Sequence, residues 1–312
     1  MTGTATTSLR VGTRRSTLAR AQAGSVGSAL TAATGRPVEL RPSLTDGDRS
    51  AARLTDIGGT GVFVAALRDR LLAGEVDVVV HSAKDLPAID HPGLVIAAVP
   101  AREDPRDVLV AAGRTLAELP DRARIGTGSP RRAAQLRALR PQLDIVPLRG
   151  NVDTRLRRVA PGDLDAVLLA RAGLLRLGRS EAAGEIFEPE RMMPAPGQGA
   201  LAVECRADDE GTRLLLREID HPASHVAVRA ERALLAALGA GCSAPVGALA
   251  TVVGADSVTG PRGIQLSAVV VSHDGTRVLR LSTTGPVDDP DRAGQRLAAA
   301  FLAAGAADLM ES

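Results

Sequence analysis

Residues 76–87 read VDVVVHSAKDLP, in which a run rich in β-branched residues is followed by the charged pair Lys84-Asp85. A continuous apolar run of this length is typical of a strand buried on both faces, in a sheet covered by helices. Lys84 and Asp85 then place an ammonium and a carboxylate side by side at the strand end, where ligands bind in open α/β sheets. The stretch therefore predicts an α/β fold and a candidate site at these two residues. From the spacing alone, an ordinary turn with an exposed ion pair stays open.

Short apolar runs alternate with helical patterns on both sides of this stretch. Strands are predicted at residues 9–13, 38–42, 76–81, 94–99, 108–111, 124–127, 144–148 and 164–170. Helices are predicted at residues 17–33 and 62–73, and after each of the last three strands. This alternating order predicts an α/β architecture with mostly parallel sheets.

The pattern changes near residue 190. Residues 193–199, MPAPGQG, have the Pro and Gly content of a linker or an ordered loop. Asp274-Gly275 is a hairpin signal. Further strands are expected at residues 201–206, 246–253, 264–272 and 277–282, and helices at residues 221–238 and 292–306. Strands followed by a helix predict a smaller α+β domain at the C-terminus.

The composition is that of a folded chain without aromatic stacking platforms. The chain has 312 residues, enough for two or three domains, and contains 3 Phe but no Tyr or Trp. Its net charge is +2, and Lys84 is the single Lys among 38 basic residues. The near-neutral charge and the scarcity of aromatic residues argue against a nucleic-acid partner.

Membrane and secretion signals are not expected. The first ten residues are Thr-rich and contain no apolar core of a signal peptide. No apolar run reaches the roughly 18 residues that span a bilayer. Two cysteines, Cys205 and Cys242, do not make a disulfide framework at this length. We therefore expect a cytoplasmic protein without a membrane segment.

Three strand ends are followed by small residues and Arg. The turns are GTRRS at 12–16, GTGSPRR at 126–132 and RGNVDTR at 149–155. Helix N-termini at such turns offer unpaired N–H groups and a positive dipole end to anions, and Arg binds carboxylates or phosphates bidentately. A single turn of this kind is also compatible with a solvated helix start. Three together predict a cleft for a ligand with many anionic groups.

Cys242 lies in the small-residue segment GAGCSAP, where its sulfur is accessible to a ligand. A thiolate there would be a nucleophile, whereas a buried Cys is a small apolar residue, and the context leaves both open. Cys205 lies in the predicted strand LAVECR and is expected to be structural. His221 and His225 have helical metal-ligand spacing, but Pro222 lies between them and no third ligand is near. We expect no metal site.

Eight segments together resemble the porphobilinogen deaminase family, and they span nearly the whole chain. Each is short, but their order and spacing in a chain of this length are specific. The segments are VGTRRSTLARAQ, GGTGVFVAAL, VDVVVHSAKDLP, IGTGSPRRAAQL, LRGNVDTRL, LLARAGLLRLG, APGQGALAVECR and ERALLAALGAGCSAPVG. The resemblance implies a monomeric transferase of tetrapyrrole (heme) biosynthesis. Such an enzyme joins four porphobilinogen units head to tail, and it releases ammonia and then hydroxymethylbilane.

The resemblance also implies the domain organisation. Two α/β lobes like those of periplasmic binding proteins are implied, with a smaller C-terminal α+β domain, and the chain crosses twice between the lobes. Domain one would comprise residues 1–103 with 195–220, domain two residues 104–194, and domain three residues 221–312.

Individual roles follow from the same resemblance. The family's cofactor is dipyrromethane, bound through a thioether that matches Cys242, and its catalytic carboxylate matches Asp85 with Lys84 beside it. These two residues also match cofactor contacts, together with Arg131, Arg132, Ser129, Thr127 and Ser82. The residues that match substrate contacts are Arg14, Ser16, Arg149, Arg155, Arg176, Gln198 and Phe63.

In the implied mechanism, Arg residues fix the substrate carboxylates, and Asp85 holds the pyrrole N–H groups while ammonia leaves. Asp56 and Thr60 stand where the family often carries Lys, so Lys contacts from that loop are not expected. Gly128 replaces one of two serines before the Arg pair. The main alternative is a non-enzymatic anion-binding protein of the periplasmic-binding fold, which would not need Cys242.

Overall fold

The chain passes three times between two units. The computed structural model describes residues 8–43, 61–241, 244–254 and 263–311, apart from the side chains of residues 61–63. Unit 1 consists of Met1–Arg102 with Ala200–His225, and unit 2 of Glu103–Gly199 with Val226–Ser312. The residues predicted as domains two and three fall largely in one unit, and the three-domain division stays a prediction.

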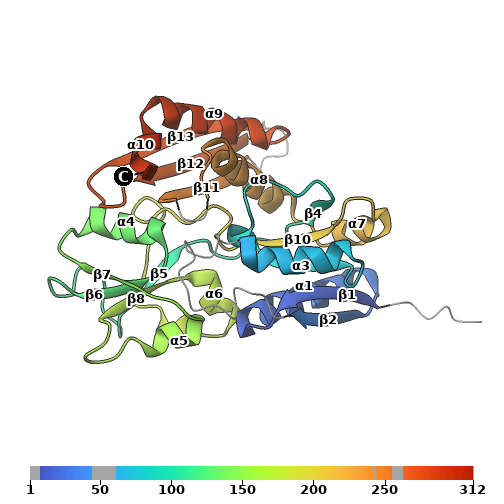
Figure 1. Cartoon of the computed structure of the whole chain (residues 1–312), viewed down its shortest axis with the longest axis horizontal. Helices are drawn as coiled ribbons and strands as arrows, with labels where there is room; N and C mark the ends of the chain where they lie inside the picture. Colours follow the sequence, from blue (N-terminus) through green and yellow to red (C-terminus); the bar gives the residue numbers. More distant parts are fainter. Residues whose placement is uncertain (1–7, 44–60, 242–243, 255–262, 312) are drawn as a thin grey trace, which may run out of the picture. The chain divides into compact units, whose positions relative to one another are not determined.

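Unit 1 contains a five-stranded sheet with helices on both faces (Figure 1). The strand order is β2 (Val38–Ser43), β1 (Leu9–Arg14), β3 (Val78–Ser82), β10 (Leu201–Arg206) and β4 (Leu94–Ala98). The helices are α1 (Thr17–Thr34), α3 (Gly61–Leu72) and α7 (Glu210–Arg217). Val26 of α1 and Leu216 of α7 pack on one face, and Leu67 of α3 packs on the other. The predicted burial of β3 on both faces is confirmed.

The first sheet of unit 2 is built in a similar way. Its order is β7 (Asp144–Pro147), β6 (Arg124–Thr127), β8 (Ala166–Ala170), β5 (Asp107–Val110) and β9 (Glu185–Ile186). The helices are α4 (Pro130–Leu139), α5 (Val152–Arg157), α6 (Arg171–Arg176) and the short η2 (Ser180–Ala182). Leu136 of α4 packs on one face, and Leu174 of α6 packs on the other.

The second sheet of unit 2 is antiparallel (Figure 1). Its strands are β11 (Val246–Val253), β12 (Gly263–Val271) and β13 (Val278–Pro286), and its helices are α8 (Pro222–Ala237), α9 (Pro290–Ala303) and α10 (Ala306–Glu311). Leu234 and Phe301 belong to the core that these helices form with the sheet. On the other face, Val269 packs with Ala134 of α4 and with Met193. Helix α4 therefore contributes to the cores of both sheets of unit 2.

The predicted fold class is confirmed, with two α/β sheets and a smaller α+β part at the C-terminus. The two α/β sheets are mostly parallel, as expected, but each contains one reversed strand: β10 and β5 run antiparallel to both their neighbours. Both strands follow connections that arrive from the other unit without a helix, whereas parallel strands are usually joined by a crossover helix. The patterns also missed β9, α7 and α10.

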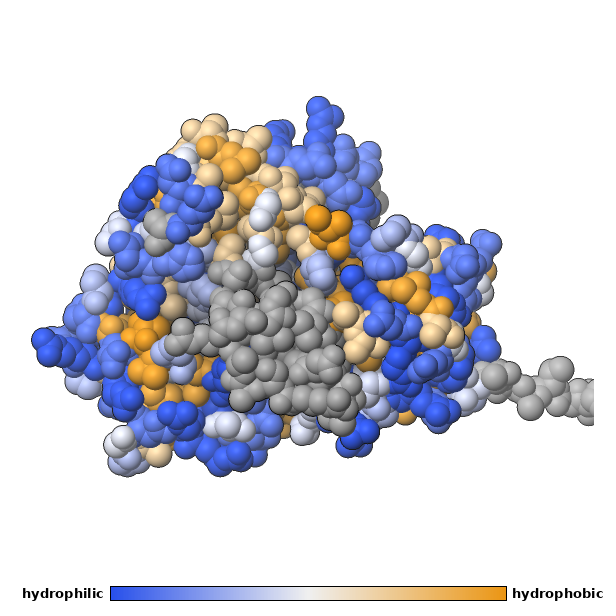
Figure 2. All heavy atoms as spheres, viewed as in Figure 1, coloured by the Kyte–Doolittle hydropathy of each residue, from blue (hydrophilic) through white to orange (hydrophobic). Residues whose placement is uncertain are grey.

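No helix in the described part of the chain is long and apolar enough to cross a bilayer. In the view of Figure 2, hydrophilic residues cover much of the visible surface, and hydrophobic residues gather near α9. Leu302 of that helix is 43% exposed.

Candidate functional site

Asp85 and Lys84 lie on a 3-10 turn, η1 (Ala83–Asp85), directly after β3. The turn is tied to the chain before β10, because Ala83 N donates a hydrogen bond to Ala200 O at 3.0 Å. Both charged side chains are half-buried. The predicted catalytic carboxylate thus stands at the carboxyl end of the middle strand of the unit 1 sheet, where the α/β pattern placed it.

Arg14 and Ser16 lie at the same edge of the sheet as this turn, because β1 pairs in parallel with β3. Ser16 caps α1, and its Oγ accepts a hydrogen bond from Ala19 N at 3.3 Å. Ser82 ends β3, and its Oγ accepts a hydrogen bond from Nε2 of the buried Gln22 at 3.0 Å. The two hydroxyls therefore have structural partners, and each keeps a capacity for one more contact.

A buried charge network joins α3 to the sheet of unit 1. Arg68 donates two hydrogen bonds to Glu204, Nε to Oε2 at 3.0 Å and Nη2 to Oε1 at 2.6 Å. His81 places Nε2 at 3.2 Å from Oε2 of the same carboxylate. Burial raises the pKa of Glu204, but the hydrogen bonds from His81 and Arg68 outweigh it and lower this pKa to about 2. This network was not predicted from the sequence, because its members are far apart in the chain.

The Arg pair of unit 2 opens α4, directly after β6. Thr127 Oγ1 accepts a hydrogen bond from Ser129 N at 3.2 Å, and Ser129 Oγ accepts one from Arg132 N at 3.4 Å. Pro130 stands in the first helical turn, where its missing N–H has no effect. The local sequence thus caps the helix and fixes the backbone from which both Arg side chains extend.

Asp107, at the start of β5, binds both of these Arg side chains. Its Oδ2 accepts from Nη1 of Arg131 at 2.7 Å, and its Oδ1 accepts from Nε and Nη2 of Arg132 at 3.0 and 2.7 Å. The three residues are 0, 3 and 4% exposed. Burial raises the pKa of Asp107, but the two guanidinium charges outweigh it and hold the pKa far below its usual range. Asp107 was not predicted as a site residue, although a carboxylate at the start of an apolar strand in an Arg-rich region was a usable signal.

Gln198 connects the loop of residues 193–199 to this cluster. Its side chain is fully buried, and Nε2 donates to Asp107 Oδ1 at 2.8 Å and to Pro105 O at 2.7 Å. Its Oε1 lies 3.5 Å from Nη2 of Arg132. The predicted substrate residue therefore supports the Arg cluster in this structure.

Glu231 connects the same loop to the C-terminal sheet. This buried side chain of α8 accepts from Gly197 N at 2.5 Å and from Ala250 N of β11 at 2.7 Å. Helix α8 leads directly into the segment that contains Cys242. Buried hydrogen bonds within unit 2 thus join the loop of residues 193–199 to the Arg cluster and to helix α8.

The remaining predicted Arg residues are more accessible. Arg176, at the end of α6, donates Nη2 to Gly199 O at 2.6 Å, and burial lowers its pKa while Glu103 opposes the effect. Arg155 donates Nε to Gly150 O at 2.8 Å. Arg149 is exposed after β7. Because β6 pairs in parallel with β7 and β8, these Arg residues and α4 follow strand ends at one edge of the sheet.

Two predicted site residues cannot be placed. Cys242 lies outside the described residues, as do Asp56 and Thr60, and so does the side chain of Phe63 at the start of α3. The roles assigned to Cys242 and Phe63 stay predictions.

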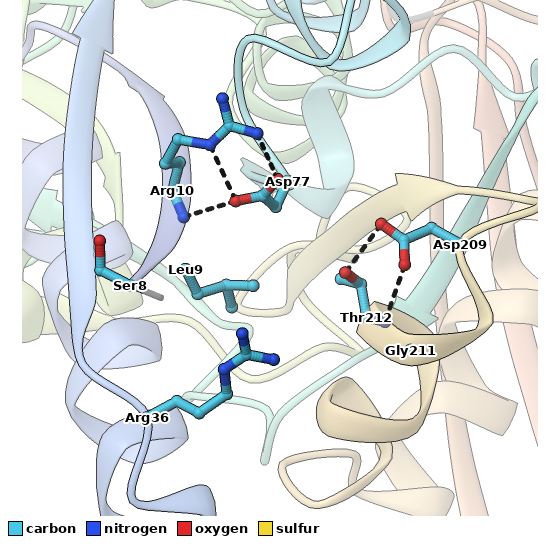
Figure 3. Close-up of a pocket in the computed structure, with 8 residues that line it drawn as sticks. All are labelled: Ser8, Leu9, Arg10, Arg36, Asp77, Asp209, Gly211 and Thr212. Carbon is cyan, nitrogen blue, oxygen red and sulfur yellow. Dashed lines mark hydrogen bonds and ion pairs between the residues drawn. The ribbon is translucent and has the colours of Figure 1, made fainter. Parts of the chain in front are cut away.

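A cavity of about 330 Å³ lies elsewhere in unit 1 (Figure 3). It is lined by Ser8, Leu9, Arg10, Arg36, Asp77, Asp209, Gly211 and Thr212. Arg10 and Asp77 form an ion pair at 2.6 Å there. The lining includes the amino ends of β1 and β3, opposite to the edge that carries Asp85, so the cavity is separate from the predicted site.

No group of three possible metal ligands occurs within the described ranges. His225 Nδ1 lies 2.9 Å from Oδ1 of Asp220, and His221 Nδ1 lies 2.9 Å from Ser224 Oγ. Each of the two imidazoles thus has a local structural partner.

Comparisons with known proteins agree on one family. The model described as porphobilinogen deaminase, dipyromethane cofactor binding domain, matches residues 9–214, and that of the porphobilinogen deaminase C-terminal domain matches residues 225–303. Porphobilinogen deaminase 1 of Streptomyces coelicolor is 56% identical over 311 residues, which cover 97% of each chain. The chain belongs to the porphobilinogen deaminase family. Porphobilinogen deaminase of Acidothermus cellulolyticus is also similar, with 57% identity over 100% of this chain and 93% of its own.

Solved structures of binding proteins show a more distant likeness. The methionine-binding protein MetQ has a TM-score of 0.44 and 12% identity, and the match covers 68% of this chain and 89% of MetQ. A periplasmic substrate-binding protein from Coxiella burnetii has a TM-score of 0.44 and 16% identity, covering 70% and 94%. Scores this low carry no conclusion about activity.

Membership makes the chain an enzyme of the porphobilinogen deaminase type with a dipyrromethane cofactor. The described residues fit such a group, because each of its pyrroles carries two carboxylates. The buried cluster of Arg131, Arg132 and Asp107 has an excess positive charge, and Nε of Arg131 is buried without a hydrogen-bond partner in the described part of the chain. An anionic ligand group would supply the missing acceptor.

The structure brings the predicted residues together in two groups, one in each unit. Unit 1 carries Arg14, Ser16, Ser82, Lys84 and Asp85 at one sheet edge. Unit 2 carries Thr127, Ser129, Arg131, Arg132, Arg149, Arg155, Arg176 and Gln198. Asp107 and Glu231, both buried in unit 2, are among the residues that were not predicted from the sequence.

Proposed function

We propose that this chain joins four porphobilinogen units head to tail and releases hydroxymethylbilane, with Asp85 as the catalytic carboxylate and Cys242 as the attachment point of dipyrromethane. The observation that carries the proposal is the family match at residues 9–214 and 225–303. Asp85 at the carboxyl end of β3 and the buried Arg cluster at the start of α4 support it. The same features do not favour a non-enzymatic anion-binding protein.

The Arg side chains bind and orient the substrate. Porphobilinogen carries an acetate and a propionate, and a planar guanidinium holds a carboxylate through two parallel hydrogen bonds. Arg14 in unit 1 and Arg149, Arg155 and Arg176 in unit 2 supply such groups at strand ends. Fixing both carboxylates of one pyrrole fixes the direction of its aminomethyl group, which is the main requirement for a directional coupling.

Asp85 stabilises positive charge and moves a proton. Loss of ammonia from the aminomethyl group leaves positive charge on the pyrrole nitrogen, and a fixed carboxylate within hydrogen-bond distance of that N–H lowers the energy of this state. The η1 turn, tied to Ala200 O, keeps the carboxylate in place. Lys84, next to Asp85 in η1, carries the positive charge that attracts substrate carboxylates to this turn. When bound, dipyrromethane supplies the free pyrrole carbon to which the first substrate unit is joined.

The proposal extends to the setting of the enzyme. We propose a monomer that acts in the cytoplasm without a nucleic-acid partner. The net charge of +2 on 312 residues and the absence of Tyr and Trp support the last point, because nucleic-acid binders commonly carry a basic excess or aromatic stacking residues. Light scattering after gel filtration tests the monomer.

Intact mass spectrometry before and after exposure to porphobilinogen tests the function. The wild-type protein should carry the mass of two linked pyrroles and then show a ladder of one to four added units. Cys242→Ser should carry no pyrrole mass, whereas the matched Cys205→Ser, at a buried cysteine of β10, should load normally. A thioether retained in Cys242→Ser would refute the attachment point.

Asp85→Asn should load the cofactor at least in part but lose most turnover, and Asp90→Asn, an exposed carboxylate on the same segment, should turn over normally. Normal steady-state activity in Asp85→Asn would refute its assigned role. A wild-type mass that never changes with porphobilinogen or with the linear tetrapyrrole would refute the proposed function.

A further inference from the structure

Arg131 has one edge of its guanidinium unused. Its Nη1 donates to Asp107 Oδ2 at 2.7 Å and to Met193 O at 2.5 Å. Its Nε is buried and has no acceptor among the residues that the structure describes. The edge formed by Nε and Nη2 is one that can pair with both oxygens of a carboxylate. A buried donor left without an acceptor is unfavourable, so this edge is suited to a ligand oxygen.

Arg132 is placed differently, although it is the next residue. Its Nε and Nη2 donate to Asp107 Oδ1, its Nη1 donates to Leu168 O at 3.0 Å, and Nη2 also approaches Gln198 Oε1. Four of its five N–H donors are thereby directed into the protein. The two adjacent guanidinium groups are therefore not equivalent. Arg132 is bound by protein acceptors, whereas Arg131 keeps its Nε–Nη2 edge for a ligand.

The charge balance of the cluster also favours a bound anion. Two guanidinium groups face a single carboxylate, and all three side chains are at least nine-tenths buried. Burial lowers the pKa of Arg131, and Asp107 opposes this effect, while the charge of Arg132 adds to it. An uncompensated positive charge in such surroundings is stabilised by a bound negative group.

We propose that Asp107 is a positioning residue for dipyrromethane: by binding Nη1 of Arg131 and two donors of Arg132, it turns the Nε–Nη2 edge of Arg131 toward one cofactor carboxylate. Gln198 holds Asp107 Oδ1 from a third direction, at 2.8 Å. The inference rests on the proposed function, because that function supplies the carboxylate.

The rate of cofactor loading tests the proposal without relying on turnover. Full-length apo-protein, made in a host that cannot make porphobilinogen, is mixed with porphobilinogen, and the two-pyrrole mass is followed with time. Asp107→Asn should load about tenfold more slowly, the effect of losing one charge-assisted hydrogen bond. Glu204→Gln is the matched control, since Glu204 is also a buried carboxylate that binds an Arg. Both variants should lower the thermal stability of the apo-protein, but Glu204→Gln should load at the wild-type rate.

A double-mutant cycle separates positioning from general damage. Arg131→Met should also load slowly, and Asp107→Asn/Arg131→Met should be no slower than Arg131→Met alone, because Asp107 acts through Arg131. Additive effects, or an Asp107→Asn variant that loads like the wild type, would overturn the positioning role while leaving the proposed function intact. A wild-type protein that never gains pyrrole mass would overturn both. Should Asp107→Asn not fold, Asp107→Glu keeps the charge but displaces the carboxylate by one methylene, and the same comparison decides.

Discussion

Replacing Glu204 by Gln should remove a large part of the acid sensitivity of unit 1. The carboxylate is 2% exposed and lies between Arg68 and His81. Its pKa in the fold is about 2, below the ordinary value of 4.5. A carboxyl group whose pKa is lower in the folded state stabilises the fold above the unfolded pKa. That contribution is lost as the pH falls from about 4.5 toward 2.

The difference between these two pKa values corresponds to about 3 kcal/mol of folding free energy. A similar magnitude follows from the geometry, because removing one partner of a buried ion pair leaves the other charge uncompensated and costs about 3–5 kcal/mol. Glu204→Gln should therefore be about 3 kcal/mol less stable than the wild type near neutral pH. The two proteins should approach each other in stability near pH 2–3, where the wild-type carboxyl becomes protonated.

Urea unfolding followed by far-ultraviolet circular dichroism measures this difference at several pH values. Fluorescence is unsuited, because the chain has no Trp and no Tyr. Glu39→Gln is the control: Glu39 pairs with Arg41, both side chains are about half exposed, and such pairs contribute little. Its unfolding curves should match the wild type throughout. A stability gap for Glu204→Gln that stays constant from neutral to acid pH would show that packing, and not the charge, is responsible.

Two further predictions concern the packing of each unit. Gly275→Ala should lower the free energy of unfolding of unit 2 by about 2–3 kcal/mol, because φ is +79° and a Cβ would lie 2.6 Å from Ala138 N of α4. Gly162→Ala, with φ +82° and no atom within 4 Å, should show only the smaller backbone strain, and equal losses would contradict the steric argument. Cys205 should resist alkylation at mildly alkaline pH in the folded protein, because burial raises its pKa to about 11. It should react once the chain is unfolded, as peptide mass mapping will show. Rapid labelling of native Cys205 would contradict its placement.

The elements that sequence analysis located well are those encoded by short local patterns. The apolar runs at residues 124–127, 201–206 and 246–253 match β6, β10 and β11 at both ends. The cap of α4 is also encoded locally, because Ser129 stands directly before the first helical residue. Such features depend on neighbours within a few residues, so one sequence is enough to predict them.

The site could be predicted only in part, because an Arg at a helix start has the same sequence pattern whether it binds a ligand or another part of the protein. Arg131 and Arg132 are neighbours, yet the structure gives them different partners. The difference arises from Asp107 and Gln198, which are distant in sequence and meet the pair only after folding. The antiparallel direction of β10 has the same origin, since β10 pairs with β3 and β4, which lie more than a hundred residues earlier in the chain.

The position of β10 has a consequence for synthesis on the ribosome. This strand lies between β3 and β4, although it is made more than a hundred residues after them. At typical elongation rates, the nascent chain waits roughly 5–20 s with two unpaired strand edges before β10 can emerge. Exposed edges of this kind can pair with strands of other chains, and a sheet without its fourth strand opens more easily. Stalled chains that end at residue 102 should therefore be degraded by protease more readily than chains that end at residue 225. The sheet of unit 1, which begins first, is therefore completed only after all five strands of the first sheet of unit 2 have been synthesised.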